Sequence, residues 1–333
     1  MRARSIAKLL GLTALTAVIF LLHVFASSRS FGFQEILREL FRPGFDDPAN
    51  RVLWVIRMPR AVCCLVVGAM LGLVGSALQA LFRNPLAEPY VVGVSSGAAV
   101  GGAIALVTGF GTAWTGFAQG LGLMIAAFPA GLLALGMVLA FARRRGVVDV
   151  QTLLLAGVVT GSMLSAVLSF VLLMGGQDTR MVLQWLLGNT SAAFWNKDDL
   201  LALALAGGAC VLVGYSKQLN AFALGEDTAR RLGVNVARLK GVLLVTSTAM
   251  VAACVGAVGI IGFLGLVAPH ISRRTLGVDW RVSLLGSGFY GACLLLGADF
   301  IAQRVLPGGE IPVGIVTAIL GAPFLLVLLR KEG

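Results

Sequence analysis

The feature that most constrains this chain is an apolar run from Ala61 to Phe82 that contains no charged side chain. About 20 such residues in helical conformation have the length that crosses the hydrocarbon core of a bilayer. The run stops at Arg83-Asn84-Pro85, a second proline follows at Pro89, and apolar sequence resumes at Tyr90. Proline has no N–H and restricts the residue before it, so the two apolar stretches cannot form one continuous helix. We therefore expect separate membrane spans joined by a tight polar turn.

The composition extends this expectation to the whole chain. Of the 333 residues, 58% are hydrophobic and 12% are charged, whereas soluble domains carry about 25% charged residues. The 43 glycines are typical of transmembrane helices that pack closely, and Gly68–Gly72 is one of several GxxxG pairs. The sequence thus predicts an all-α polytopic membrane protein with one transmembrane domain over residues 1–333.

Apolar runs separated by polar connections predict about ten transmembrane helices per chain. The first, Leu9–Ala26, follows a basic N-terminus, a pattern that also fits a signal peptide, but we expect an uncleaved span. The run Gly259–Ile271 is short for a crossing, so we expect it to tilt, to be partly buried or to merge with its neighbour. The other predicted spans are Ala61–Phe82, Val91–Gly109, Gly116–Phe141, Val150–Met174, Leu200–Tyr215, Gly241–Val255, Val282–Val305 and Ile311–Leu329.

The distribution of positive charge predicts which side each connection faces. With the N-terminus inside, most of the 26 lysine and arginine residues fall in cytoplasmic connections, as the positive-inside rule requires. An even number of spans places the C-terminus inside as well. The longest polar connection, residues 27–59, then faces outward, and apolar residues at helical spacing in 33–41 predict a short interfacial helix there.

Several kinds of function are disfavoured by the sequence. The formal charge of +11 lies between apolar spans and not on a stripe interleaved with aromatic residues, so we expect no nucleic-acid partner. The five cysteines lie in apolar segments without C-x-x-C spacing, and we expect them to pack and not to bind metal. The sequence contains no P-loop, no G-x-S-x-G and no H-E-x-x-H, so we expect neither enzymatic activity nor a cofactor in this chain.

Arginines mark the predicted outer side. Arg57 and Arg60 flank Met58-Pro59 at the mouth of one span, and Arg304 lies near the outer end of another. Such arginines either snorkel to lipid headgroups or receive an acidic partner. Asp299 lies five residues before Arg304, and we expect a local charge pair between the two. His270 has no second ligand near it in sequence, and we expect it to be a hydrogen-bonded structural residue.

The longest predicted inner connection, residues 219–240, carries a second charge pattern. Glu226 and Asp227 begin a helical stretch, Arg230 and Arg231 end it, and Gly233 follows as a C-cap. Acid at the start and base at the end both complement the helix dipole. The partial apolar face fits either an ordinary surface loop or a segment that packs on a cytoplasmic partner.

Motifs along nearly the whole chain resemble those of one family, the permease subunits of ABC importers (FecCD-type) for iron–siderophore, haem and cobalamin. The matching segments occur in the family's order. They are Arg57–Arg60, Gly75–Gln79, Arg83–Pro89, Gly93–Ala98, Leu224–Gly233, Gly262–His270, Ile311–Ala318 and Gly321–Phe324.

The resemblance implies roles for particular residues. Arg57, Arg60 and Arg304 match arginines that receive glutamates of the substrate-binding protein. Asn84 and Leu86 match the cytoplasmic gate. The segment 224–233 matches the coupling helix that sits in a groove of the ATPase subunit. The matching residues there are Leu224, Gly225, Glu226, Ala229, Arg230, Leu232 and Gly233.

The resemblance also implies the partners and the location. The permease is expected to be a homodimer in the bacterial inner membrane, in contact with lipid, two cytoplasmic ATPase subunits and an outer substrate-binding protein. ATP and Mg²⁺ would bind the ATPase subunit and not this chain. The cargo would be a metal chelate, and the sequence does not choose between siderophore, haem and cobalamin.

The sequence leaves two other functions open. A secondary carrier or channel working alone would need an ion gradient, and such carriers normally place ionisable residues mid-span, which this sequence lacks. A membrane enzyme would need a reactive constellation, and none is evident in the sequence.

Overall fold

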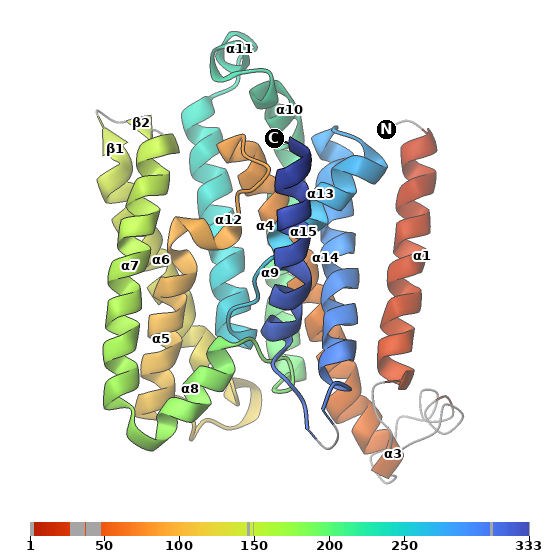
Figure 1. The fold of residues 1–333 in the computed structure, drawn as a ribbon, viewed down its shortest axis with the longest axis vertical. Coiled ribbons are helices and arrows are strands. Elements are labelled where there is room, and N and C mark those ends of the chain that lie inside the picture. Colours follow the sequence, from red (N-terminus) through yellow and green to blue (C-terminus); the bar gives the residue numbers. More distant parts are fainter. Residues whose placement is uncertain are drawn as a thin grey trace.

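The computed structural model describes residues 3–26, 37, 48–144, 147–148, 150–306 and 309–332. Nearly all of the described chain is helical, apart from one two-residue antiparallel pair, β1 (Arg143–Arg144) with β2 (Val147–Val148). A helix stands at each predicted span (Figure 1). These helices are α1 (Ala3–Ala26), α4 (Met58–Phe82), α5 (Val94–Thr108), α6 (Gly122–Ala142), α7 (Val150–Met174), α9 (Trp195–Gly214), α12 (Val236–Val258), α13 (Leu264–Leu276), α14 (Trp280–Ala302) and α15 (Val313–Glu332).

Not all of these helices are long enough to cross a bilayer. By length and hydropathy alone, six described helices could span a membrane, or seven if α9 and α10 (Ser216–Ala223), which meet at a 47° bend, form one span. Helix α13 has 13 residues, as short as the sequence predicted, and α5 has 15. Both begin after breaks in the α-helical structure. The ten predicted spans thus correspond to ten helices of unequal length.

Helix α4 forms the centre of the molecule and packs most extensively against α14. Glycines permit this contact: a Cβ at Gly68 would lie 2.4 Å from the carbonyl oxygen of Gly291, and one at Gly72 would lie 2.0 Å from that of Ser287. In a membrane, helices associate through such close backbone approach because lipid supplies no hydrophobic driving force. The predicted GxxxG pair Gly68–Gly72 therefore forms the α4–α14 contact.

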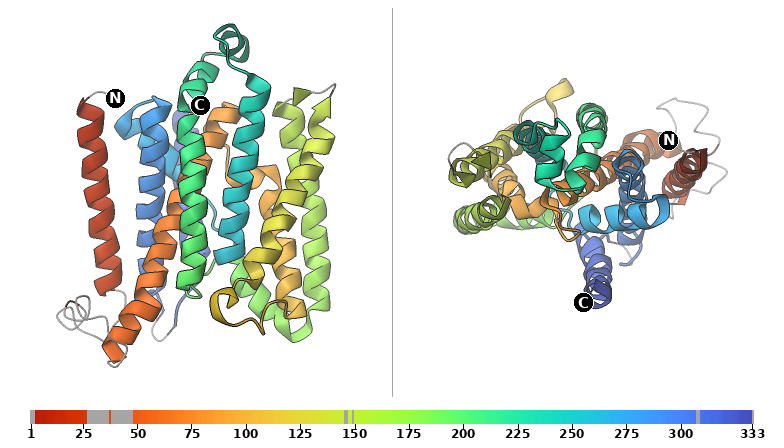
Figure 2. Two further views of the ribbon diagram at one scale, coloured as in Figure 1. Left: turned by 180° about the vertical axis from the view of Figure 1, so that it is seen from behind. Right: turned by 90° about the horizontal axis from the view of Figure 1, so that it is seen from above.

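The remaining helices surround this pair. Helices α5, α6 and α7 pack on one another at one side, and α12 joins them to α4. Helix α1 packs on α14 at the opposite side (Figures 1 and 2). Helix α15 contacts α13 and α14 and stands out from the body when the molecule is viewed from above (Figure 2).

The short elements lie at the two ends of the bundle. Helices α10 and α11 (Glu226–Arg231) lie at the end that also holds both chain termini, called here the α11 end (Figure 1). Helices α3 (Pro48–Arg51) and α8 (Thr179–Leu186) lie at the other, the α8 end. The predicted interfacial helix at 33–41 lies outside the described residues except for position 37. The π-helix η1 (Val52–Arg57) and the 3-10 helices η2 (Pro89–Val92), η3 (Gly116–Ala118) and η4 (Gly176–Asp178) complete the described helical elements.

Two breaks in the helical structure meet inside the molecule. The segment before α5 contains Glu88 and Tyr90, and the segment before α13 contains Ile261 and Phe263. The Tyr90 hydroxyl accepts a hydrogen bond of 2.9 Å from the Ile261 N–H and donates to the carbonyl of the same residue. The Glu88 carboxylate accepts from the N–H of Phe263, which precedes α13 with φ +68°. Side chains of one break thus satisfy the backbone of the other.

Replacing Tyr90 with phenylalanine tests this contact. We expect the free energy of unfolding to fall by about 1–2 kcal/mol, because the backbone groups of Ile261 lose their partner inside the protein. Denaturation of the detergent-solubilised chain measures the change. Tyr290→Phe is the matched control, because the hydroxyl of Tyr290 donates to Thr275 Oγ1 in an exposed contact. Equal unfolding of the two variants would show that the contact between the breaks adds no stability.

Candidate functional site

Asp299 is the hub of a buried polar cluster near the α8 end, and its side chain has no exposed surface. Arg60 donates to both carboxylate oxygens, from Nε and Nη2, each at 2.9 Å. His23 Nε2 lies 2.8 Å from Oδ2, Gln303 donates to Oδ2 at 2.7 Å, and Thr190 donates to Oδ1. The cluster therefore ties α1, α4, α14 and the loop after α8 together through one bidentate ion pair and its hydrogen bonds.

The predicted docking arginines lie at the same end, but two of them are buried. Arg60 is 7% exposed and also donates to Glu310 at 2.7 Å, while Arg57 is 2% exposed and donates to the carbonyls of Val24 and Phe25. Arg304 is half-buried, and its guanidinium carbon lies 3.8 Å from the centre of the Phe300 ring. The three residues share one end, and groups of the chain itself hold Arg57 and Arg60.

We expected Asp299 to form a local charge pair with Arg304. In the structure its main partners are Arg60 and His23 instead. The reason is tertiary: Arg60 is 239 residues away in sequence and is brought close by the α4–α14 contact. Ligand atoms of His23, Cys64 and Asp299 also lie within 4.8 Å of one another. Because Arg60 already neutralises the carboxylate, a cation there would have to displace the guanidinium, and we interpret the group as an ion-pair network.

The predicted helix at the α11 end has the expected boundaries. Helix α11 runs from Glu226 to Arg231, and the N–H of Gly233 (φ +82°) closes it on the carbonyl of Arg230. The Arg230 guanidinium donates to Glu226 Oε1 at 2.6 Å, and Lys240 donates to Oε2 at 3.0 Å. The contact to Lys240 was not evident from the sequence and anchors α11 to the buried start of α12.

Apolar residues of α11 and its flanks divide into a buried and an exposed set. Ala229 is fully buried, whereas Leu224 and Leu232 are 69% and 62% exposed. Gly225 precedes the helix with φ +126°, a conformation that favours glycine. The leucines on either side of α11 therefore present apolar surface that this chain leaves uncovered.

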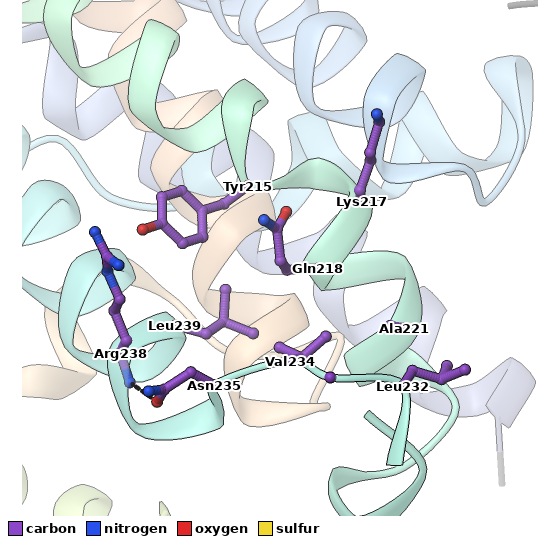
Figure 3. Close-up of a pocket in the computed structure, with 10 residues that line it drawn as sticks. Tyr215, Lys217, Gln218, Ala221, Leu232, Val234, Asn235, Arg238 and Leu239 are labelled. Carbon is purple, nitrogen blue, oxygen red and sulfur yellow. Dashed lines mark hydrogen bonds between the residues drawn. The ribbon is translucent and has the colours of Figure 1, made fainter. Parts of the chain in front are cut away.

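A cavity of about 440 Å³ lies beside α11, between α10 and the start of α12. Lys217 and Leu232 lie at its edge and point away from its centre, while Arg238 and Tyr215 flank the other side (Figure 3). The Asn235 side chain caps α12 by accepting from the N–H of Arg238. The lining is Tyr215, Lys217, Gln218, Ala221, Leu232, Gly233, Val234, Asn235, Arg238 and Leu239. Arg238 and Lys217 place positive charge at the rim of the cavity, which suits acidic or polar groups of a partner.

The predicted gate residues lie in the turn after α4, also at the α11 end. Asn84 is exposed and Leu86 is half-buried. The Asn84 side-chain oxygen accepts a hydrogen bond from the N–H of Leu86 at 2.8 Å, and the backbone carbonyl of Asn84 accepts one from the N–H of Ala87. This turn, closed by the Asn84 side chain, fixes the shape of the connection between α4 and α5 that contains Pro85 and Pro89.

Comparisons with known proteins match this architecture. The model of the FecCD transport family matches residues 15–331. The cobalamin import system permease protein BtuC of Halobacterium salinarum is 39% identical over 289 residues, 87% of this chain and 76% of that protein. The iron-uptake system permease protein FeuC of Bacillus subtilis is 34% identical over 321 residues, 96% of each chain. A solved structure of a metal-chelate type ABC transporter in an inward-facing conformation aligns with a TM-score of 0.84 and 31% identity, covering 98% of this chain and 99% of that one.

Proposed function

This chain belongs to the FecCD transport family and is the permease subunit of an ABC importer, and we propose that it imports a cobalamin or an iron chelate. The family match over nearly the whole chain carries the proposal. A relative named for cobalamin import and one named for iron uptake have similar sequence identity to this chain. Identity therefore does not choose between the two cargoes, and both remain candidates, with haem as the third. The permease itself is a non-catalytic subunit, and ATP and Mg²⁺ act in a separate ATPase subunit.

The ATPase subunits dock at the α11 end, which faces the cytoplasm. Three observations support this assignment: the exposed leucines on either side of α11, the ion pairs that anchor it, and the polar cavity beside it. Leu224, Leu232 and Gly225 form the contact surface, and Glu226, Ala229, Arg230 and Gly233 hold its shape. Two ATPase subunits serve two copies of this chain.

The substrate-binding protein docks at the α8 end. Arg304, which is half-buried and stacks on Phe300, supplies positive charge at this end, and Arg60 becomes available when its outer partner Glu310, which is 46% exposed, is exchanged for an acidic group of the binding protein. Arg57 lies buried beneath this surface and holds the end of α1 in place by donating hydrogen bonds to its carbonyls. The arginines thus orient the partner by charge.

Two copies of the chain enclose the path of the cargo. Helices α7 and α15 carry large apolar side chains that the single chain leaves exposed, and a second copy would cover part of them. Asn84 and Leu86 close the path on the cytoplasmic side. The exposed residues include Leu155, Met163, Phe170, Leu173, Ile319, Leu320, Leu326 and Val327.

The decisive experiment reconstitutes the chain in liposomes with its encoded ATPase and binding protein. We expect uptake of labelled cobalamin, ferric siderophore or haem that requires ATP, and one cargo should exceed the others. Uptake by the chain alone, driven by an ion gradient, would favour the stand-alone carrier and overturn the proposal.

Replacing Glu226 and Arg230 together with glutamine tests the role of α11. We expect uptake to fall about fivefold, at the lower end of coupling free energies, because α11 loses its anchor to Lys240. Binding of the substrate-binding protein at the α8 end should not change, and a binding assay in detergent measures it. Unchanged uptake would remove α11 from the energy-coupling surface.

A further inference from the structure

Arg83 joins two segments that the proposed function treats separately. It ends α4 in the left-handed conformation, with φ +50°, and its Nη2 donates to the carbonyl of Phe222 at 3.0 Å. The same guanidinium lies 4.6 Å from the centre of the Phe222 ring. One side chain thus makes a charged hydrogen bond and a cation–π contact with one residue.

Phe222 lies in the last turn of α10, immediately before α11. Its side chain is 1% exposed, and its carbonyl also accepts from the N–H of Gly225. The carbonyls at a helix C-terminus lack helical donors and carry partial negative charge, which favours a cation. Arg83 therefore holds the backbone that leads into α11 at Glu226.

The other side of Arg83 is the gate turn, defined here as residues 83–89. The N–H of Asn84 bonds to the carbonyl of Gln79, and Leu86 and Ala87 bond to Asn84. Glu88 then holds the N–H of Phe263 at the start of α13. The turn is therefore bonded to α4 and to the interior break, so a displacement of Arg83 would be passed on to Asn84 and, through Glu88, to the segment before α13.

A second contact of α10 leads to α14 and bypasses the gate turn. Asn220 donates to Asp279 Oδ1 at 2.8 Å and accepts from the N–H of Trp280 at 3.1 Å. This contact holds α10 against α14 without involving Arg83. A variant that breaks it is therefore a control for the Arg83–Phe222 contact, which also holds α10.

We propose that Arg83 is a positioning residue that transmits movement of α11 to the gate turn. The proposal rests on the proposed function, because it presumes that an ATPase moves α11 and that Asn84 and Leu86 form the gate. When α11 shifts, Phe222 shifts with it, and the guanidinium draws Asn84 along. Without Arg83, α11 still receives the ATPase but no longer moves the gate.

The test compares Arg83→Ala with Arg274→Ala in the complete transporter, with ATPase and binding protein, in liposomes. Arg274 is an exposed arginine at the end of α13 and controls for loss of one positive charge. For Arg83→Ala we expect normal assembly, ATP hydrolysis close to the wild type, and uptake reduced about tenfold, within the usual range of coupling energies. The ratio of ATP hydrolysed to cargo imported therefore rises about tenfold.

The alternatives give distinct results. A ratio equal to that of Arg274→Ala would overturn the proposal. So would an Arg83→Ala chain that folds but no longer binds the ATPase, because Arg83 would then be a docking residue. If Arg83→Ala does not fold, Arg83→Lys takes its place: lysine keeps the charge and loses the planar stack, so the ratio should rise about threefold, and a wild-type ratio would overturn the proposal.

Two further comparisons complete the test. Asn220→Ala breaks the contact of α10 with α14 and should leave the ratio of hydrolysis to uptake within about twofold of the wild type, below typical coupling energies. A ratio as high as that of Arg83→Ala would mean that α10 acts as a general support and not through Arg83. Failure of the wild-type complex to import any cargo with ATP would instead overturn the proposed function itself.

Discussion

Asp299→Asn is expected to lower the free energy of unfolding by about 3–5 kcal/mol, the cost of removing one partner of a buried ion pair. Arg60, 7% exposed, would keep its charge without the carboxylate that binds Nε and Nη2. His23 and Thr190 would lose part of their hydrogen bonding at the same time. Thermal or denaturant unfolding of the purified chain in detergent measures the loss.

The same guanidinium provides the control. Glu310→Gln removes the other carboxylate on Arg60, but Glu310 is 46% exposed, so the expected cost is at most about 1 kcal/mol. Asp299→Leu combined with Arg60→Met should unfold less easily than Asp299→Leu alone, because Asp299→Leu alone leaves a buried guanidinium that only the exposed Glu310 pairs. If Asp299→Asn and Glu310→Gln unfolded alike, the cluster would not carry the stability assigned to it.

Local patterns in the sequence predicted local structure well. The prolines at 85 and 89 predicted the break between α4 and α5, and the charges at Glu226 and Arg231 predicted the ends of α11. Both depend on contacts within a few residues, which a sequence displays directly. The GxxxG pair Gly68–Gly72 was equally visible, but nothing in the sequence distinguished it from the other pairs or identified α14 as its partner.

Contacts between distant segments could not be predicted in this way. The partner of Asp299 is Arg60, 239 residues away, whereas the nearest charge in sequence suggested Arg304. The contacts of Lys240 with Glu226 and of Arg83 with Phe222 were missed for the same reason. Spacing shows which side chains share a helix face, and only the packed helices show which faces meet.

Burial changes the expectation for the docking arginines most. A basic residue at the end of an apolar run is expected to be exposed, because the apolar residues of the run are the ones expected to be buried. In the structure α4 extends through η1 into α3, so Arg57 and Arg60 lie within a longer helical body. If the substrate-binding protein docks at the α8 end as we propose, we expect it to meet Arg304 and Glu310 first and to reach Arg60 only by replacing Glu310.

Replacing Leu224 and Leu232 together with serine is expected to abolish binding of the ATPase subunit at micromolar concentrations. Burying one leucine side chain contributes about 1.5–3 kcal/mol, so two at the centre of an interface change affinity by at least about 100-fold. The two side chains are 69% and 62% exposed in the free chain, so the variant should fold normally. Co-purification and a titration of the detergent-solubilised permease with the ATPase measure the loss.

Val278→Ser is the matched control for this prediction. Val278 lies between α13 and α14, carries an apolar side chain that is 79% exposed, and is not part of α11 or its flanks. Its replacement should leave binding of the ATPase nearly unchanged. The wild type, the double leucine variant and Val278→Ser should unfold at similar temperatures. A leucine variant that bound the ATPase as tightly as Val278→Ser would contradict docking through the leucines and would leave the polar cavity as the remaining candidate contact at the α11 end. Binding would then depend on Lys217 and Arg238 and would weaken with rising salt, because exposed charges are screened.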